Sequence, residues 1–308
     1  MSVLRLEAVS RWYGDVVAVN DVSMEIGPGI TGLLGPNGAG KSTLIHMMGG
    51  FLKPSSGVVT LDGRDVFDNV EIYRQVGIVP EREEMYDSIS GWKFVLANAQ
   101  LHGLADPAAS ARRAIEIVDM IDAQQRDIRT YSKGMRQRIK LATAIVHEPR
   151  VLLLDEPFNG LDPRQRLHMM ELLRGMAADG CSVLFSSHIL EEVEQLATSI
   201  EVLVAGRHAA SGDFRAIRGL MTQRPHQYVV RSSDDRALAA SLMNDPGVGG
   251  VQLETVALDD EQLRVEVTDV ASFARTLPQA ARAAGIDLRE VRPADESLES
   301  VFAYLVAR

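Results

Sequence analysis

The sequence predicts an α/β protein with a parallel sheet at its core, followed by a smaller α+β domain. Domains commonly hold about 150 residues, so a chain of 308 residues has room for two. Residues 151–154 form an all-apolar run between Pro149 and Asp155, which is typical of a strand buried on both faces. After this run, helical and strand patterns alternate, as they do around a parallel sheet.

The first 218 residues carry most of the predicted elements. Short apolar or alternating runs predict strands at residues 3–9, 22–26, 30–34, 58–61, 76–79, 151–154, 182–186 and 200–204. Helical periodicity predicts helices from the glycine-rich turn through Gly49, within the stretch 89–147, and at 163–178 and 189–196. Within the long helical stretch, Pro107 is expected to open one helix.

Residues 219–308 follow a different rhythm. Strands are predicted at 228–230, 248–256, 262–267 and 287–291, and helices at 236–243, 270–284 and 298–306. The order strand, helix, strand, strand, helix, strand is that of a ferredoxin-like unit. No residue pattern in this domain indicates catalytic chemistry.

Composition excludes several classes of protein. The single cysteine, Cys181, rules out an intramolecular disulfide framework and a cysteine-built zinc cluster. The formal net charge of −10 does not indicate a nucleic-acid-binding surface, and no nucleic-acid partner is expected. No apolar run approaches the ~18–20 residues of a membrane-spanning helix, so the chain is expected not to cross a membrane.

A glycine-rich segment predicts a phosphate-binding loop. It fits the pattern G-x-x-x-x-G-K-[ST] and consists of Gly35, Pro36, Asn37, Gly38, Ala39, Gly40, Lys41, Ser42 and Thr43. Glycines let the backbone wrap closely around a polyphosphate, and the following helix N-terminus attracts its negative charge. Lys41 is expected to neutralise the β- and γ-phosphates, and the Ser42 hydroxyl to ligate Mg²⁺. The strand pattern before the segment and the helical pattern after it disfavour an ordinary glycine-rich loop.

Two acidic residues follow the buried strand 151–154. Ligands of open α/β sheets bind at the carboxyl ends of the strands, which is where Asp155 and Glu156 are expected. We expect Asp155 to reach Mg²⁺ through water, and Glu156 to act as the general base on an attacking water. Two solvated acids at a strand end are the alternative, which the phosphate loop disfavours.

Residues 131–138, Tyr-Ser-Lys-Gly-Met-Arg-Gln-Arg, precede the acidic strand and begin a helix. They resemble the signature sequence of ABC ATPases, in a variant common in bacterial exporter ATPases, with Lys133 where glycine is usual. In that family the signature of one subunit binds the γ-phosphate held by another subunit. The resemblance therefore assigns Ser132 and Gly134 to a partner's nucleotide, whereas in isolation they also fit a simple helix cap.

Four further positions resemble motifs of the same family. Asp162 ends a segment like the D-loop at the dimer interface, and His188 resembles the switch histidine that contacts the γ-phosphate. Glu81 stands where the family usually has glutamine, and the resemblance assigns it to Mg²⁺ or its water. Tyr13 resembles the aromatic residue that stacks on adenine, with Trp12 as a rival and a place in the core as an alternative.

The resemblance covers residues 3 to about 218. It implies a P-loop ATPase with a parallel sheet core, an antiparallel β subdomain and a helical subdomain at about 82–147. Residues 219–308 resemble only the accessory C-terminal domain of some exporter ATPases, through the ending L-E-S-V-F at 298–302. A role in dimer contact or regulation, or plain structural packing, remains open for this domain.

By this resemblance the chain is the ATP-binding and ATP-hydrolysing subunit of an ABC exporter, with ATP and Mg²⁺ as cofactors. The chain has one phosphate loop and one signature, so the resemblance implies a dimer that sandwiches ATP head to tail, expected to be a homodimer, with a heterodimer containing a second ATPase as the alternative. The resemblance also implies an integral membrane permease on a separate chain and a cytoplasmic position, peripheral on the inner face of the cell membrane. The alternatives are a soluble ABC ATPase acting on the ribosome or DNA, and a non-hydrolysing regulatory module. The negative net charge disfavours the first, and the intact Lys41, Asp155, Glu156 and His188 disfavour the second.

Overall fold

The computed structural model describes the chain in five stretches, residues 3–82, 85–213, 226–243, 245–257 and 260–294. The chain divides into two compact units, Met1–Asp213 and Phe214–Arg308. Each unit has a hydrophobic core of its own. The predicted domain boundary at 218/219 and the predicted helix 298–306 lie outside the described residues.

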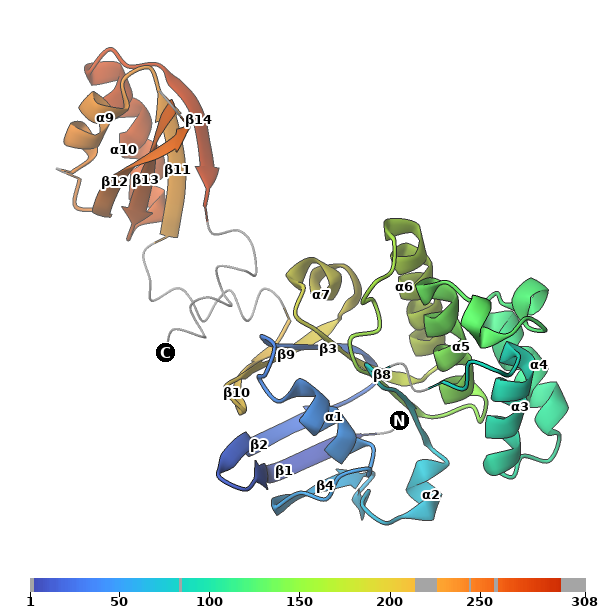
Figure 1. Cartoon of the computed structure of the whole chain (residues 1–308). Helices are drawn as coiled ribbons and strands as arrows, with labels where there is room; N and C mark the ends of the chain where they lie inside the picture. The colour runs from blue at the N-terminus through green and yellow to red at the C-terminus, as the bar shows by residue number, and fades with distance from the viewer. Residues whose placement is uncertain (1–2, 83–84, 214–225, 244, 258–259, 295–308) are drawn as a thin grey trace. The chain divides into compact units, whose positions relative to one another are not determined.

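A mainly parallel sheet forms the centre of the first unit, with the strand order β10-β9-β3-β8-β7-β6 (Figure 1). Its strands are β3 (Gly29–Leu34), β6 (Val76–Val79), β7 (Val151–Leu154), β8 (Ser182–Ser187), β9 (Ser199–Val204) and β10 (Arg207–Gly212). Every neighbouring pair is parallel except β9 and β10, which are antiparallel. The prediction of a parallel core is confirmed. Strand β10, with the sequence Arg-His-Ala-Ala-Ser-Gly, contains no large apolar residue and was not predicted.

An antiparallel sheet lies beside the parallel one, with the order β2-β1-β4-β5. Its strands are β1 (Leu4–Tyr13), β2 (Val16–Ile26), β4 (Ser56–Leu61) and β5 (Arg64–Asp65). Strands β1 and β2 are longer than predicted, because they pair as a hairpin up to Tyr13 and Val16. Helix α1 (Lys41–Met48) lies between the two sheets, and its buried apolar side chains join them in one core (Figure 1).

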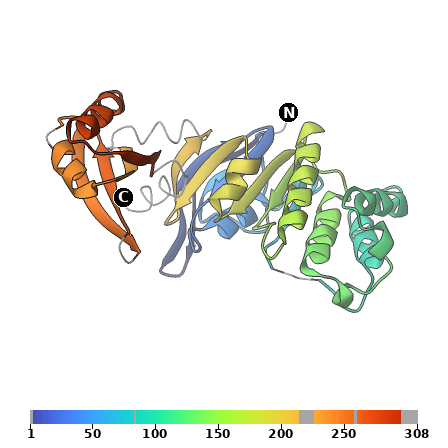
Figure 2. The same cartoon turned by 90° about the horizontal axis from the view of Figure 1, so that it is seen from above.

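A group of helices stands at the end of the unit that carries β6 and β7, away from β10 (Figures 1 and 2). It consists of α3 (Gly91–Leu101), α4 (Pro107–Ile117) and α5 (Lys133–Ile145). Pro107 occupies the first turn of α4 behind the capping Asp106, as predicted. The short α2 (Val70–Tyr73) precedes β6, and α6 (Pro163–Ala178) and α7 (Leu190–Leu196) pack against β3 and β8. No helix among the described residues is long and apolar enough to span a membrane.

The second unit contains an antiparallel sheet with the order β12-β13-β11-β14. Its elements follow the chain as β11 (His226–Ser232), α9 (Asp235–Leu242), β12 (Val248–Ala257), β13 (Asp260–Val267), α10 (Val270–Ala283) and β14 (Leu288–Pro293). Buried side chains of both helices and of the sheet form its core. The predicted ferredoxin-like arrangement is confirmed for this part of the chain.

Two histidines stack where the helical group meets the parallel sheet. The rings of His102, at the end of α3, and His147, after α5, are nearly parallel with centroids 3.9 Å apart. The Nε2 atom of His147 lies 3.2 Å from the carbonyl oxygen of Val76 in β6. Burial, and next the neighbouring His102, lower the pKa of His147 from 6.5 to about 4. The folded structure therefore favours the neutral form of the His147 ring.

This stack predicts that acid weakens the first unit. Between pH 6.5 and about 4 the unfolded chain binds a proton at His147 that the folded chain does not, so the free energy of unfolding falls as the pH decreases. His147→Gln keeps a side-chain amide that can reach Val76 but cannot titrate. We expect urea unfolding of this variant to show a shallower loss of stability across that window than the wild-type chain. Equal slopes in the two proteins would contradict the prediction.

Candidate nucleotide-binding site

The glycine-rich segment forms a loop between β3 and α1. Gly40, the N-cap of α1, has a φ of 99°, and a Cβ atom there would lie 2.4 Å from the carbonyl oxygen of Ala18. The loop therefore needs glycine at this position. The Lys41 ammonium turns back over the loop and donates hydrogen bonds to the carbonyl oxygens of Gly35 at 2.7 Å and Pro36 at 3.2 Å. No side chain caps α1, so its N-terminus keeps its affinity for an anion.

Asp155 and Glu156 leave β7 in a sharp turn. Glu156 has a φ of 49°, a left-handed conformation that costs a residue with a side chain about 1 kcal/mol or more. Its backbone N–H donates to the Oγ atom of Ser186 in β8 at 2.9 Å, and the same hydroxyl donates to Oδ1 of Asp155 at 2.7 Å. One buried serine on the neighbouring strand therefore holds both acids in place.

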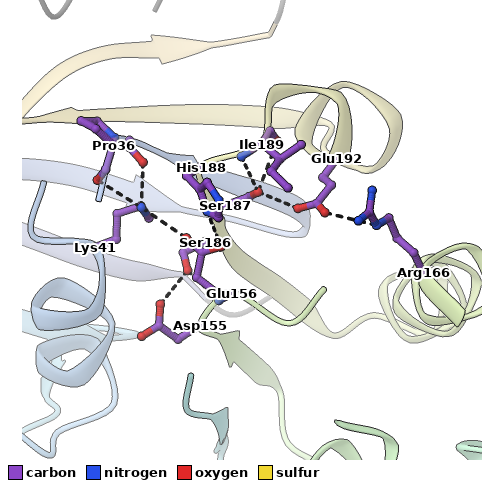
Figure 3. A network of polar contacts seen from close by, with 11 residues as sticks. Pro36, Lys41, Asp155, Glu156, Arg166, Ser186, Ser187, His188, Ile189 and Glu192 are labelled. Carbon is purple, nitrogen blue, oxygen red and sulfur yellow. Dashed lines mark hydrogen bonds and ion pairs between the residues drawn. The ribbon is translucent and has the colours of Figure 1, made fainter. Parts of the chain in front are cut away.

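The Glu156 carboxylate lies between two basic side chains (Figure 3). Its Oε1 atom is 3.3 Å from the Nζ atom of Lys41, and its Oε2 atom is 2.9 Å from Nδ1 of His188. Lys41 and Glu156 are both buried, whereas about a third of the His188 side chain is exposed. Oε1 accepts no hydrogen bond from the described residues. A carboxylate held in this way can accept a proton from a water molecule beside it.

These residues line one open pocket of about 440 Å³. Its lining consists of Ala18, Asn37, Gly38, Gly40, Lys41, Ser42, Thr43, Glu81, Glu156, Asn159 and His188. The volume is within the range of small-molecule sites. The structure thus brings together the loop, Glu81, Glu156 and His188, as predicted, and Asp155 lies beside them in the buried turn.

The signature residues and Asp162 are not in the lining of this pocket. Ser132 caps α5, where its Oγ atom accepts a hydrogen bond from the N–H of Met135 at 3.3 Å. Asp162 caps α6 and forms a reciprocal capping box with Gln165. A Cβ atom on Gly134 would lie 2.4 Å from the Gln165 side chain. The starts of α5 and α6 are therefore packed together. In the single chain, Ser132 acts as a helix cap, which was the alternative to a role in nucleotide binding.

Tyr13 also lies outside the lining of the pocket. Tyr13 and Trp12 are each 47% exposed at the end of β1, so the alternative that Tyr13 is a core residue is wrong. The guanidinium of Arg11 lies over the Tyr13 ring, 4.9 Å from its centroid. An exposed aromatic ring of this kind can accept a stacked partner.

Lys140 of α5 is a residue that sequence reasoning missed. Its buried ammonium donates to the carbonyl oxygens of Pro80 and of Glu81, the latter at 3.3 Å. It therefore ties the backbone at Glu81 to the helix that begins at the signature. Ser186 was missed as well, because only the pairing of β7 with β8 reveals its role.

The site defines a P-loop ATPase, and comparisons with known proteins give its family. A family model described as ABC transporter matches residues 19–159. Daunorubicin resistance ATP-binding protein DrrA3 of Streptomyces coeruleorubidus is 31% identical over 308 residues, which cover 99% of this chain and 96% of that protein. Bacitracin transport ATP-binding protein BcrA of Enterococcus faecalis is 28% identical, with 99% of this chain and 96% of that protein covered.

Solved structures agree with these sequence matches. The ATP-binding subunit of an ABC transporter has a TM-score of 0.65 at 28% identity, covering 71% of this chain and 93% of its own. The dimeric bacterial ABC transporter cassette MJ0796, at 22% identity and a TM-score of 0.64, shows the same fold over 69% of this chain and 99% of its own. The chain belongs to the ABC transporter family as an ATP-binding subunit, and ATP hydrolysis is the general activity of that family.

The shared serine of the acidic turn generates a testable prediction. Ser186→Ala removes the donor to Asp155 and the acceptor for the Glu156 N–H, and leaves buried polar groups unpaired. We expect the free energy of unfolding to fall by about 1–3 kcal/mol in urea titrations. Exposed Ser88→Ala is the control and should change it by no more than about 0.5 kcal/mol. An effect of Ser186→Ala as small as that of the control would contradict the assigned role.

Proposed function

We propose that this chain is the ATP-hydrolysing subunit of an ABC exporter and drives transport through a separate membrane permease. The observation that carries the proposal is the buried Glu156 carboxylate, held between Lys41 and His188 at the wall of a pocket behind a phosphate loop. The transport role is supported by relatives of nearly the same length, whose names refer to daunorubicin resistance and bacitracin transport.

Each residue of the pocket has a role in this proposal. The loop from Gly35 to Thr43 encloses the phosphates of ATP, and Lys41 neutralises the β- and γ-phosphates. Glu156 accepts the proton of the attacking water, and His188 orients the Glu156 carboxylate and contacts the γ-phosphate. Tyr13 stacks on the adenine ring.

The side chains also fit a bound Mg²⁺. Ser42 and Glu81 line the pocket, and Asp155 lies next to Glu156 in the buried turn. Hydroxyl and carboxylate oxygens are suitable ligands for this hard cation, so Ser42, Glu81 and Asp155 would hold it directly or through water. Bound together with ATP, the ion neutralises charge on the phosphates.

A homodimer completes the site in this proposal. Ser132, Gly134 and Asp162 lie outside the lining of the loop's own pocket, and Ser132 and Asp162 are exposed. We assign them to the ATP held by a second copy, in a head-to-tail sandwich. The dimeric cassette with the same fold supports this assignment.

The permease contact is assigned to the helical subdomain, at about residues 82–147. Binding there would place the chain on the cytoplasmic face of the membrane as a peripheral subunit. ATP binding closes the dimer, the helices move the permease, and hydrolysis reopens the dimer.

The general base provides the first test. Glu156→Gln keeps the size of the side chain but removes the base, so we expect turnover to fall by about 10²–10⁴-fold while ATP binding persists. An ATP-bound dimer should accumulate, measurable by size-exclusion chromatography with light scattering. Exposed Glu116→Gln is the matched control and should leave turnover unchanged. Undiminished turnover in Glu156→Gln would remove Glu156 from the mechanism.

Affinity purification of the tagged full chain from its own cells provides the second test. We expect an integral membrane protein to co-purify and to change the rate of ATP turnover measured by phosphate release. Recovery of ribosomes or DNA in place of a membrane protein would contradict the transporter proposal. A purified wild-type chain without ATP turnover would favour a regulatory module.

A further inference from the structure

A second polar cluster lies behind His188, on the side away from Lys41 (Figure 3). The Ser187 hydroxyl donates to the Oε2 atom of Glu192 at 2.6 Å and accepts a hydrogen bond from the Ile189 N–H at 2.9 Å. Ser187 and Glu192 are buried, with 0% and 3% of their surface exposed. Because Ser187 and Ile189 flank His188, these two bonds fix the backbone on both sides of the histidine.

The other oxygen of Glu192 faces helix α6. Oε1 lies 3.3 Å from the Nε atom of Arg166. In this ion pair the Glu192 side chain is buried, whereas the Arg166 side chain is partly exposed. Burial raises the pKa of Glu192, while the Ser187 hydrogen bond and the charge of Arg166 act in the opposite direction. Glu156 and His188 are the other charged or titratable groups that act on it. A buried carboxylate with these partners is costly to place there, so its presence calls for a role.

Arg166 connects this cluster to the first turn of α6. Its backbone N–H donates to the carbonyl oxygen of Asp162, the N-cap of the helix, at 2.9 Å. The turn that carries His188 is thereby tied to the residue that we assign to the dimer interface.

We propose that Glu192, held by Arg166, is a positioning residue for hydrolysis. It sets the backbone of residues 187–189 and thereby places the His188 imidazole against Glu156. The inference rests on the proposed function, since it gives Glu192 an effect only through His188 and Glu156. Glu192 is not expected to touch ATP, because the pocket lining does not include it.

The first test compares two glutamates of α7. Glu192→Gln removes the negative charge that pairs with Arg166 and leaves one acceptor oxygen for two donors, Ser187 and Arg166. We therefore expect kcat to fall about 10-fold or more while KM for ATP changes less than about twofold. Exposed Glu194→Gln, on the same helix, should leave both constants unchanged. Arg166→Met should lower kcat as Glu192→Gln does, whereas Arg166→Lys keeps the positive charge and should lower kcat less. The double variant Arg166→Met with Glu192→Gln should lose no more kcat than either single variant. Equal kcat in Glu192→Gln and Glu194→Gln would overturn the inference.

The second test separates positioning from a general loss of structure. In a His188→Ala background, single-turnover hydrolysis should show no further loss from Glu192→Gln, because the histidine through which Glu192 acts is gone. A loss by the same factor with and without His188 would overturn the positioning role and leave the proposed function standing. If His188→Ala alone hydrolyses ATP at the wild-type rate, the site assignment fails, and the inference fails with it.

Discussion

The contact between Lys41 and Glu156 is the constraint around which the first unit is organised. Two opposite charges are buried 3.3 Å apart, and removing either partner would leave an uncompensated charge in the interior. The lysine begins α1 and the glutamate follows β7, so the pair forms only when the ends of β3 and β7 face the same edge of the sheet. Strand β8 lies between them in the strand order and supplies Ser186, and His188 directly follows this strand. Parallel pairing puts all three strand ends at that edge.

Two parts of the site, the phosphate loop and the acidic pair, could be predicted from the sequence. The loop pattern at residues 35–43 and the acidic pair after an apolar strand are short-range signals, and each motif lies in one segment. The apolar run 151–154 also indicated a buried parallel strand, and the structure places it, fully buried, between β8 and the edge strand β6. The ferredoxin-like order of the second unit could likewise be predicted, because it follows from the order of local strand and helix patterns along the chain.

The remaining features depend on contacts between distant parts of the chain. Ser186, Glu192 and Lys140 are common residue types with no local motif. Their partners lie in other segments of the chain, which are the turn after β7, helix α6 and the turn after β6. The length of β1 could not be predicted, since its pairing with β2 is interrupted by register shifts that break the alternation. The exposure of Tyr13 could not be predicted either, because the exposure of a side chain at a hairpin end depends on the neighbouring strand.

In the proposed homodimer each chain supplies half of a site, and packing within the first unit connects the residues that we assign to that half. Gly134 and Gln165 hold the signature and the start of α6 together, while the Arg166–Glu192 contact ties α6 to the His188 turn. The exposed Ser132 and Asp162 cap these two helices and lie outside the lining of the pocket behind the loop. In the proposed homodimer these two residues face the ATP that the second copy holds.

The dependence of ATP turnover per chain on chain concentration tests this half-site claim most directly. With the full chain at saturating ATP and Mg²⁺, we predict a rate per chain that rises with concentration and reaches a plateau, in parallel with the dimer fraction from light scattering. A rate per chain that stays constant while the protein is monomeric throughout would contradict the claim.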